Sequence, residues 1–206
     1  MGRGRHAGYD GQRELILARA AALFARNGYQ GTTMNQVAEA CGLSKATLYH
    51  YYRDKYALLV SIADGHVSRL RAIVDDAVAE ESTPQGQMRA LVRRLVEEYA
   101  NAQNEHRVLT EDVRFLQPED RERILGKERE VVAGFARVVA AMRPDLKEAA
   151  MSKPLTMLLF GMVNWMFTWM KPEGALAYDD MAPVVSDLFL GGLQAVQVPL
   201  NAAAID

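Results

Sequence analysis

The chain has 206 residues, of which half are hydrophobic, and its formal net charge is −2. This composition suits one or two soluble domains with a substantial core, and the single cysteine, Cys41, excludes a disulfide framework. The charge is uneven, because residues 1–55 carry eight Lys and Arg against four Asp and Glu, whereas the remainder carries sixteen against twenty-two. A basic end on an acidic body is typical of polyanion binding, although ordinary solvated charge explains it equally well.

Helical signals follow one another along the chain after a basic arm at residues 1–10, which we expect to be flexible. Ile16, Ala20 and Phe24 recur at helical spacing, and Asn27-Gly28 is a helix stop signal. No stretch alternates as a strand does. The pattern therefore predicts an all-α fold of nine helices, the later eight beginning near residues 34, 45, 55, 84, 107, 118, 154 and 179.

Residues 33–52 carry the signals of a helix-turn-helix, in which a tight turn joins two short helices. Thr33 and Gln36 have the spacing of a capping box, and Gly42 stands where a helix needs a left-handed residue to end. Ser44 is a good N-cap for the second helix. The alternative is a plain helical corner of the kind found in any α protein.

The second of these helices carries small, hydroxylic, aromatic and basic side chains and no acidic one. The first turn of a recognition helix enters the major groove, so residues 45–47 stand where base edges are read. Hydroxyl, imidazole and ammonium groups nearby suit contacts with phosphate oxygens. The predicted DNA-binding residues are Thr33, Lys45, Ala46, Thr47, Tyr49, His50 and Lys55.

The run from Gly28 to Lys55 resembles the DNA-binding domain of TetR-family regulators. The resemblance rests on Gly28-Tyr29-x-Gly31-Thr32-Thr33-Met34, Val37-Ala38, Cys41-Gly42-Leu43-Ser44-Lys45-Ala46-Thr47-Leu48-Tyr49-His50-Tyr51-Tyr52 and Asp54-Lys55. It is close over residues 11–60, and the rest of the chain fits a nine-helix plan. One departure is Tyr52, where the family commonly has Phe, so the added hydroxyl must find water or a partner.

The resemblance implies a repressor that leaves a palindromic double-stranded operator when a small hydrophobic inducer binds. It divides the chain into an arm at 1–10, a helix-turn-helix DNA-binding domain at 11–55, and a helical ligand-binding and dimerisation domain at 56–206. It also implies a homodimer built on the last two helices. The last helix independently shows an apolar stripe of Met181, Val184, Val185, Leu188, Phe189 and Leu193. The alternative is that both helices are simply the core of one chain.

The family also implies an inducer pocket among the middle helices, for which the sequence offers apolar walls and a polar amide. Ordinary core packing explains each apolar residue as well. Two segments, Glu111–Arg121 and Phe160–Gly174, resemble regulators that sense acyl-CoA thioesters, and basic residues near the first suit the CoA phosphates. The candidate ligand-binding residues are Phe115, Met162, Asn164, Trp165, Trp169, Arg114 and Arg121, with Arg123, Lys127 and Arg129 as further candidates.

Three alternatives remain at this stage. A lipophilic cationic drug is the other inducer considered, and it requires acidic groups such as Glu97, Glu98, Glu111 or Asp112 in the pocket. An enzyme is disfavoured because no metal spacing, phosphate loop or nucleophile motif appears, so we expect no cofactor, metal or catalytic residue. A membrane span at residues 154–170 is at the margin of the required length. Without a signal-peptide pattern, we expect a cytoplasmic protein without membrane contact.

Overall fold

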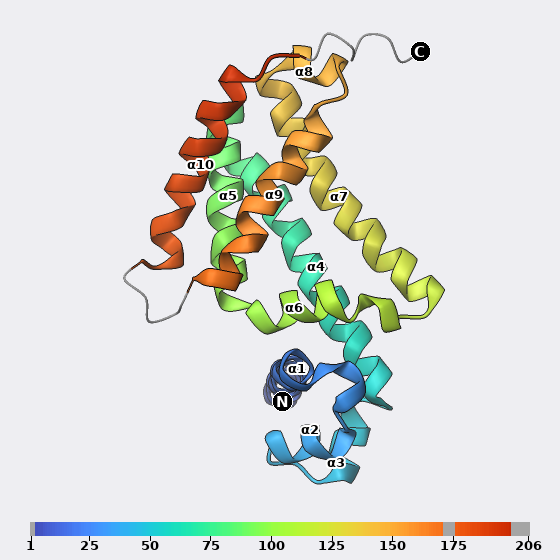
Figure 1. Cartoon of the computed structure of the whole chain (residues 1–206). Coiled ribbons are helices and arrows are strands. Elements are labelled where there is room, and N and C mark those ends of the chain that lie inside the picture. Colours follow the sequence, from blue (N-terminus) through green and yellow to red (C-terminus); the bar gives the residue numbers. More distant parts are fainter. Residues whose placement is uncertain (1–2, 171–175, 199–206) are drawn as a thin grey trace. The chain divides into compact units, whose positions relative to one another are not determined.

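The computed structural model describes residues 3–170 and 176–198, and the regular elements in these ranges are all helices, as predicted. Figure 1 shows their arrangement. The elements are α1 Arg3–Gly31, α2 Met34–Ala40, α3 Lys45–Tyr51, α4 Lys55–Glu80, α5 Pro84–Asn101, α6 Gln103–Glu111, the short 3₁₀ helix η1 Val113–Phe115, α7 Pro118–Met142, α8 Pro144–Glu148, α9 Ser152–Trp169 and α10 Tyr178–Ala195.

Three elements differ from the expected plan, and one of them is the 3₁₀ helix η1, which follows α6 where a single helix from about residue 107 was expected. The arm expected to be flexible is helical from Arg3 onward, as the beginning of α1. An existing helix extends readily, because each added residue brings a backbone hydrogen bond without a new nucleation step. The short helix α8, which opens with Pro144, was not predicted, and it makes the last predicted helix α10. The predicted stop at Gly28 is confirmed, since a φ of 75° there interrupts the helical path of α1.

The described chain forms two compact units. Unit 1 comprises the residues up to Ser68 together with Ala102–Leu125, and unit 2 comprises Arg69–Asn101 together with the residues from Gly126 onward. Helix α4 therefore begins in unit 1 and ends in unit 2. The domain boundary predicted between residues 55 and 56 lies inside unit 1, and the functional division at that point stays a prediction.

Unit 1 has a core in which α1 lies against α2 and α6. Ile16, Phe24, Leu48 and Leu58 are fully or almost fully buried in it. Burial of such side chains contributes roughly 1.5–3 kcal/mol each. Asp54 begins α4 as predicted, because its carboxylate accepts a hydrogen bond from the Ala57 N–H at 2.7 Å.

Unit 2 contains the rest of the helical body, in which α5 packs along α10 (Figure 1). The rings of Phe135 on α7 and Phe160 on α9 lie 4.9 Å apart in its core. Arg143 fastens the end of α10, because its guanidinium donates to the carbonyl oxygens of Leu193 at 2.7 Å and Val196 at 3.0 Å. These carbonyls belong to the last turn and its exit, where a helix has unsatisfied acceptors.

Helix α9 is the apolar stretch whose length is marginal for a membrane span. Among residues 3–170 and 176–198, no helix combines the length and apolarity that a crossing requires. Its apolar residues divide between two surroundings: Leu159 and Val163 are buried in unit 2, whereas Leu158 and Trp165 are exposed.

Candidate DNA-binding site

The first helix of the helix-turn-helix begins with a complete capping box. The Thr33 hydroxyl accepts from the Gln36 N–H at 3.3 Å, and the Gln36 side-chain oxygen accepts from the Thr33 N–H at 2.8 Å. Each side chain thus satisfies a backbone donor that the helix leaves free. Thr33 is exposed at this helix start, as its predicted phosphate contact requires.

The turn between α2 and α3 has the geometry that glycine permits. Gly42 has a φ of 66°, in the left-handed region. The Gly42 N–H donates to the Glu39 carbonyl at 3.0 Å, and the Leu43 N–H donates to the Ala38 carbonyl at 2.9 Å. This pair of bonds is a Schellman motif, which ends a helix and redirects the chain within two residues. The predicted tight turn is therefore confirmed.

The second helix starts at a serine cap and shows its polar face to solvent. The Ser44 hydroxyl accepts from the Thr47 N–H at 3.1 Å and lies 2.8 Å from the Thr47 hydroxyl. Leu48 is fully buried and fixes the inward face of α3. The outward face brings together five of the predicted residues, Lys45, Ala46, Thr47, Tyr49 and His50, all of them exposed.

Lys55 is engaged differently from the predicted phosphate contact. Its ammonium donates to the carbonyl oxygens of Tyr29 at 2.7 Å, Thr32 at 2.8 Å and Gln30 at 3.3 Å. It also lies 4.4 Å from the centre of the Tyr29 ring. Its N–H donors thus meet three carbonyls of residues 29–32, which supports a structural role, and the phosphate contact predicted for Lys55 stays a prediction. Burial lowers the pKa of this ammonium, against the opposing effect of Asp112.

The segment after α6 supports the same end of α1. The Asp112 carboxyl is buried, and burial raises its pKa although it accepts a hydrogen bond from the Tyr29 N–H. The ring of Phe115 lies 5.5 Å from that of Tyr29. Phe115 therefore packs against the end of α1 in unit 1.

Helix α1 also braces the far end of α3, through contacts that the sequence analysis missed. The Arg13 guanidinium donates to the Tyr52 hydroxyl at 3.3 Å, so the hydroxyl that departs from the family pattern has a partner. One turn earlier on α1, the Tyr9 ring stacks on Tyr51 with centroids 4.8 Å apart. The available signal was the i, i+4 spacing of Tyr9 and Arg13 on one face of a helix.

The seven candidate ligand-binding residues are divided between the two units. Arg114, Phe115 and Arg121 belong to unit 1, whereas Met162, Asn164, Trp165 and Trp169 belong to unit 2. Trp165 and Trp169 are 68% and 51% exposed, so they lie on the surface of the described protomer. The Asn164 side-chain oxygen is buried and accepts no hydrogen bond from the described residues, which suits a polar group of a ligand.

A groove of about 660 Å³ runs between α5 and α10 within unit 2. Its rim includes Arg89, Arg93, Glu97 and Asp179, and none of the seven candidate ligand residues lines it. Arg93 and Glu97 form an ion pair at 3.2 Å. The groove therefore has charged residues of both signs among its lining residues, and it is separate from the residues proposed to bind the inducer.

Comparisons with known proteins match both parts of the chain. The family model described as "Bacterial regulatory proteins, tetR family" matches residues 16–62, and "Tetracyclin repressor-like, C-terminal domain" matches residues 81–193. The crystal structure of a TetR-family transcriptional regulator from Bordetella parapertussis 12822 is 32% identical, with a TM-score of 0.82, and the match covers 91% of this chain and 98% of that one.

Two further proteins resemble the chain over most of its length. The HTH-type transcriptional repressor KstR2 of Mycobacterium tuberculosis is 26% identical over 192 residues, 89% of this chain and 94% of that protein. AibR, solved in complex with isovaleryl coenzyme A and operator DNA, has a TM-score of 0.73 at 24% identity and covers 86% of this chain and 97% of that one. At this identity, the AibR structure supports the fold alone.

Proposed function

The chain belongs to the TetR family of bacterial transcriptional regulators, and on that premise we propose that it is a homodimeric repressor that binds a palindromic operator through α2 and α3. The observation that carries the proposal is the acid-free outward face of α3, at whose first turn Lys45, Ala46 and Thr47 are exposed. These three residues read base edges in the major groove, while Thr33, Tyr49 and His50 contact phosphates. Because such a repressor has to reach its operator DNA, the proposal includes a cytoplasmic location.

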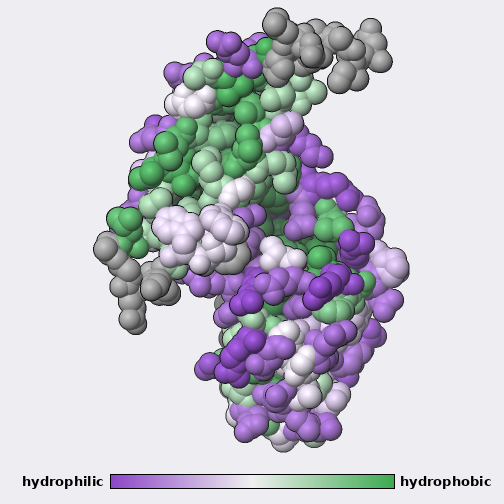
Figure 2. Space-filling view, viewed as in Figure 1, coloured by the Kyte–Doolittle hydropathy of each residue, from purple (hydrophilic) through white to green (hydrophobic). Residues whose placement is uncertain are grey.

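A second copy of the chain covers the exposed apolar surface of α9 and α10. This surface, here called the apolar face, consists of six large apolar side chains that are 45–68% exposed in the protomer: Met157, Leu158, Trp165, Trp169, Val184 and Leu188. Figure 2 shows hydrophobic residues gathered over these two helices. Exposed apolar surface of this extent marks an interaction site on a water-soluble protein.

Two further observations support a symmetric helix pairing at the apolar face. Gly161, Gly191 and Gly192 are exposed, and a Cβ added at any of them would meet nothing within 4 Å. Their small size serves no packing within the protomer, and it allows helices of a partner to approach closely. The predicted stripe on the last helix divides accordingly, because Val185, Phe189 and Leu193 are buried within the protomer while Val184 and Leu188 remain exposed.

The dimer supplies the geometry that a palindrome needs. A two-fold axis relates the two copies of α3, which then meet half-sites about one helical turn (~34–36 Å) or a multiple of it apart. Binding of both half-sites by one dimer raises the affinity far above that of a single helix-turn-helix, because the second contact becomes intramolecular.

The proposed inducer is an acyl-CoA thioester. AibR was solved with isovaleryl coenzyme A and operator DNA, and the Mycobacterium tuberculosis KstR2 is described as a ketosteroid transcriptional regulator. Within this chain, the buried Asn164 oxygen is available to a donor on the ligand, and Met162 on the same helix offers adaptable apolar surface. Trp165 and Trp169 are assigned to the apolar face instead.

A lipophilic cation is the less favoured inducer, because the acidic residues considered for it already have partners. Glu97 pairs with Arg93, Glu98 pairs with Arg69 at 2.8 Å, and Glu111 pairs with Arg107 at 2.9 Å. The Asp112 carboxyl is buried and accepts a hydrogen bond from the Tyr29 N–H, so it also has a partner within the chain.

The test is binding of the purified dimer to the promoter region of its own gene, measured across a range of salt concentrations. We expect salt-dependent binding that weakens when Tyr49 is replaced by Ala, and a changed base preference when Lys45 or Thr47 is replaced. Intact dimer that binds no neighbouring operator at low salt contradicts the repressor assignment. Release by acyl-CoAs and not by lipophilic cations supports the proposed inducer, and the reverse result contradicts it.

A further inference from the structure

Helix α7 contains two interior glycines whose surroundings differ sharply. Glycine is unfavourable inside a helix, so its presence there calls for a packing reason. At Gly126, an added Cβ would have its nearest neighbour at 3.7 Å, an ordinary contact with the flexible end of Arg129. At Gly134, an added Cβ would overlap Cγ1 of Val74 and lie 3.3 Å from its Cγ2 and 3.4 Å from its Cβ.

The overlap at Gly134 has no cheap remedy. Val74 on α4 is 3% exposed, so its side chain is enclosed by its neighbours. It is also β-branched, and such a side chain has one strongly preferred rotamer in a helix. Because the valine has no free space to rotate into, α4 and α7 can approach this closely only while residue 134 lacks a side chain.

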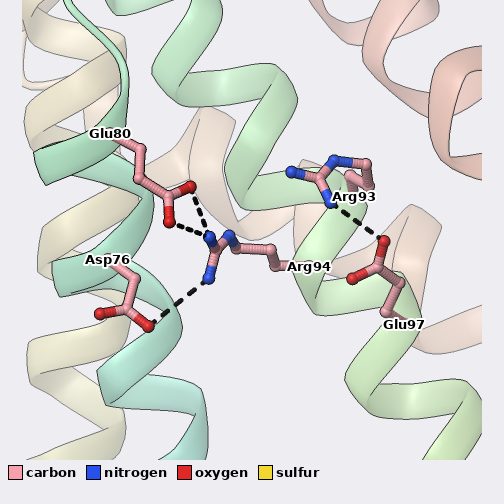
Figure 3. Close-up of polar contacts among 5 residues, drawn as sticks. All are labelled: Asp76, Glu80, Arg93, Arg94 and Glu97. Carbon is pink, nitrogen blue, oxygen red and sulfur yellow. Dashed lines mark hydrogen bonds and ion pairs between the residues drawn. The ribbon is translucent and has the colours of Figure 1, made fainter.

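This contact lies within a set that fixes the second half of α4. Arg71 and Glu130 form an ion pair at 2.9 Å about one turn from the glycine contact. On another side, Arg94 of α5 binds Glu80 and lies 3.5 Å from Asp76, as Figure 3 shows. Exposed ion pairs contribute little energy, so the packing of Val74 on Gly134 determines how closely α4 approaches α7.

The first half of α4 is held separately, within unit 1. The Tyr56 hydroxyl donates to the Asp120 carboxylate at 2.6 Å and accepts from the Gln117 N–H at 3.0 Å. The His66 and His106 rings are joined by a hydrogen bond of 3.3 Å. Because α4 is one continuous helix from Lys55 to Glu80, a displacement of its second half is transmitted to these contacts and so to the helix-turn-helix that Lys55 adjoins.

We propose that Gly134 is a positioning residue for operator binding: its contact with Val74 holds α4 at the spacing from α7 that the operator-bound dimer requires. This inference rests on the proposed repressor function. A side chain at position 134 increases the distance between α4 and α7 where Val74 meets Gly134, and so displaces α4. The dimer then shifts towards a form with low operator affinity even when no inducer is bound.

The experiment measures operator affinity for the full-length dimer carrying Gly134→Ala. We expect a loss of about tenfold, the size that altered coupling typically produces, with dimer mass and helical content unchanged. The matched control is Gly126→Ala, the same substitution on the same helix at a site with room for a methyl group. The control should bind within about twofold of the parent protein.

A compensating variant keeps the proposal testable if Gly134→Ala folds poorly. Val74→Ala combined with Gly134→Ala removes both Cγ methyl groups of residue 74 and adds one methyl group on the facing helix, which relieves the overlap, so operator affinity should return to within about threefold of the parent protein. Wild-type affinity in Gly134→Ala overturns the inference, and so does failure of the double variant to recover while it remains a folded dimer. If the parent dimer binds an operator normally in these cases, only this inference fails. If the parent dimer binds none, the proposed function fails with it.

Discussion

The helix-turn-helix and unit 2 are stabilised by contacts of very different range. In the helix-turn-helix, Thr33 and Gln36 cap one helix, Ser44 and Thr47 cap the next, and the turn closes through bonds between residues five or fewer apart. In unit 2, Arg94 reaches Glu80, 14 residues away, and Arg143 reaches Leu193, 50 residues away. In the helix-turn-helix, contacts between near neighbours in sequence determine the course of the backbone at the caps and the turn. In unit 2, the packing of the helices depends on contacts that form only when distant segments have come together.

This difference suits the two proposed tasks. A surface that reads DNA needs a fixed geometry, and local caps and turns provide it with few requirements on the rest of the chain. A body that changes state on binding a ligand needs elements with more than one arrangement, and helices held by distant side-chain contacts can shift against each other. If this assignment is right, changes to long-range contacts should affect assembly and stability more than they affect the local geometry of the helix-turn-helix.

The largest effect is expected from disrupting the proposed interface between two copies of the chain, since this contact lies entirely outside the single chain. Leu188→Glu places a carboxylate in the apolar face, where dimerisation would bury it without a partner. We expect a folded protomer that does not dimerise and whose operator affinity falls at least about a hundredfold, because two linked half-site contacts become one. Analytical ultracentrifugation and operator titration measure the two effects.

The control for this variant is Val78→Glu on α4, which introduces the same charge at an apolar residue that is also exposed but lies outside the apolar face. It should leave dimer mass and operator affinity unchanged. A Leu188→Glu protein that remains dimeric with parental affinity would show that α9 and α10 do not form the interface.

A smaller effect is expected from pH, through the histidine pair that joins α4 to α6. Burial, and secondarily the neighbouring His66, lower the pKa of His106 to about 4. In the unfolded chain His106 takes up its proton near pH 6.5, but in the folded chain it stays neutral until about pH 4. The effect of His106 on the unfolding free energy is therefore constant above pH 6.5. As the pH falls from 6.5 towards 4, the unfolded chain binds a proton that the folded chain does not, so the unfolding free energy decreases.

Between pH 7 and pH 5, this linkage amounts to about 2 kcal/mol of unfolding free energy. Urea unfolding at the two pH values measures it, at a fixed protein concentration because the dimer couples unfolding to association. The variant His106→Gln removes the titrating imidazole and should lose most of this pH dependence. The carboxylates of the chain titrate equally in both proteins and so do not affect the comparison. An unchanged pH dependence in the variant would show that the His106 pKa is not lowered in the folded state.

The third effect distinguishes a structural lysine from a DNA-binding one. Lys55→Met leaves the Tyr29, Gln30 and Thr32 carbonyls without their shared donor, which should lower the unfolding free energy by about 1–2 kcal/mol. The salt dependence of operator binding should keep its slope, whereas loss of a phosphate contact would reduce that slope by about one. Lys45→Met is the matched control, and it should weaken operator binding while stability is preserved.

Lys55 also illustrates what could be predicted from the sequence and what could not. The capping box, the glycine turn and the serine cap were predicted correctly because their partners are adjacent in the chain. The partners of Lys55 are 23 to 26 residues away, and a lysine next to a recognition helix gives no sign that distant carbonyls already hold it. The same distance explains why the Tyr9–Tyr51 stack was missed.

The body was harder to predict for a second reason. Helix α9 is apolar on every side, so its sequence gives no period from which to tell an inward residue from an outward one. Trp165 and Trp169 were interpreted as pocket residues on composition, but both are exposed in the protomer, as Leu158 and Leu188 are. The Val74–Gly134 contact depends on a helix crossing that only the assembled unit reveals.

The smallest effect concerns Tyr52, whose hydroxyl makes one of the two long-range contacts between α1 and the end of the helix-turn-helix, the other being the Tyr9–Tyr51 stack. The Tyr52 ring is buried, and its hydroxyl accepts from Arg13 on α1. Tyr52→Phe keeps the ring and removes the acceptor, so the unfolding free energy should fall by about 0.5–1 kcal/mol, the net value of one hydrogen bond. Operator affinity should change less than twofold, because the local caps of α2 and α3 are untouched. Arg13→Met removes the donor instead, and the double variant should cost no more than the larger single change if the bond is the shared cause. A marked loss of operator affinity in Tyr52→Phe would instead show that the recognition helix depends on α1 for its position, which would weaken the contrast between the two regions.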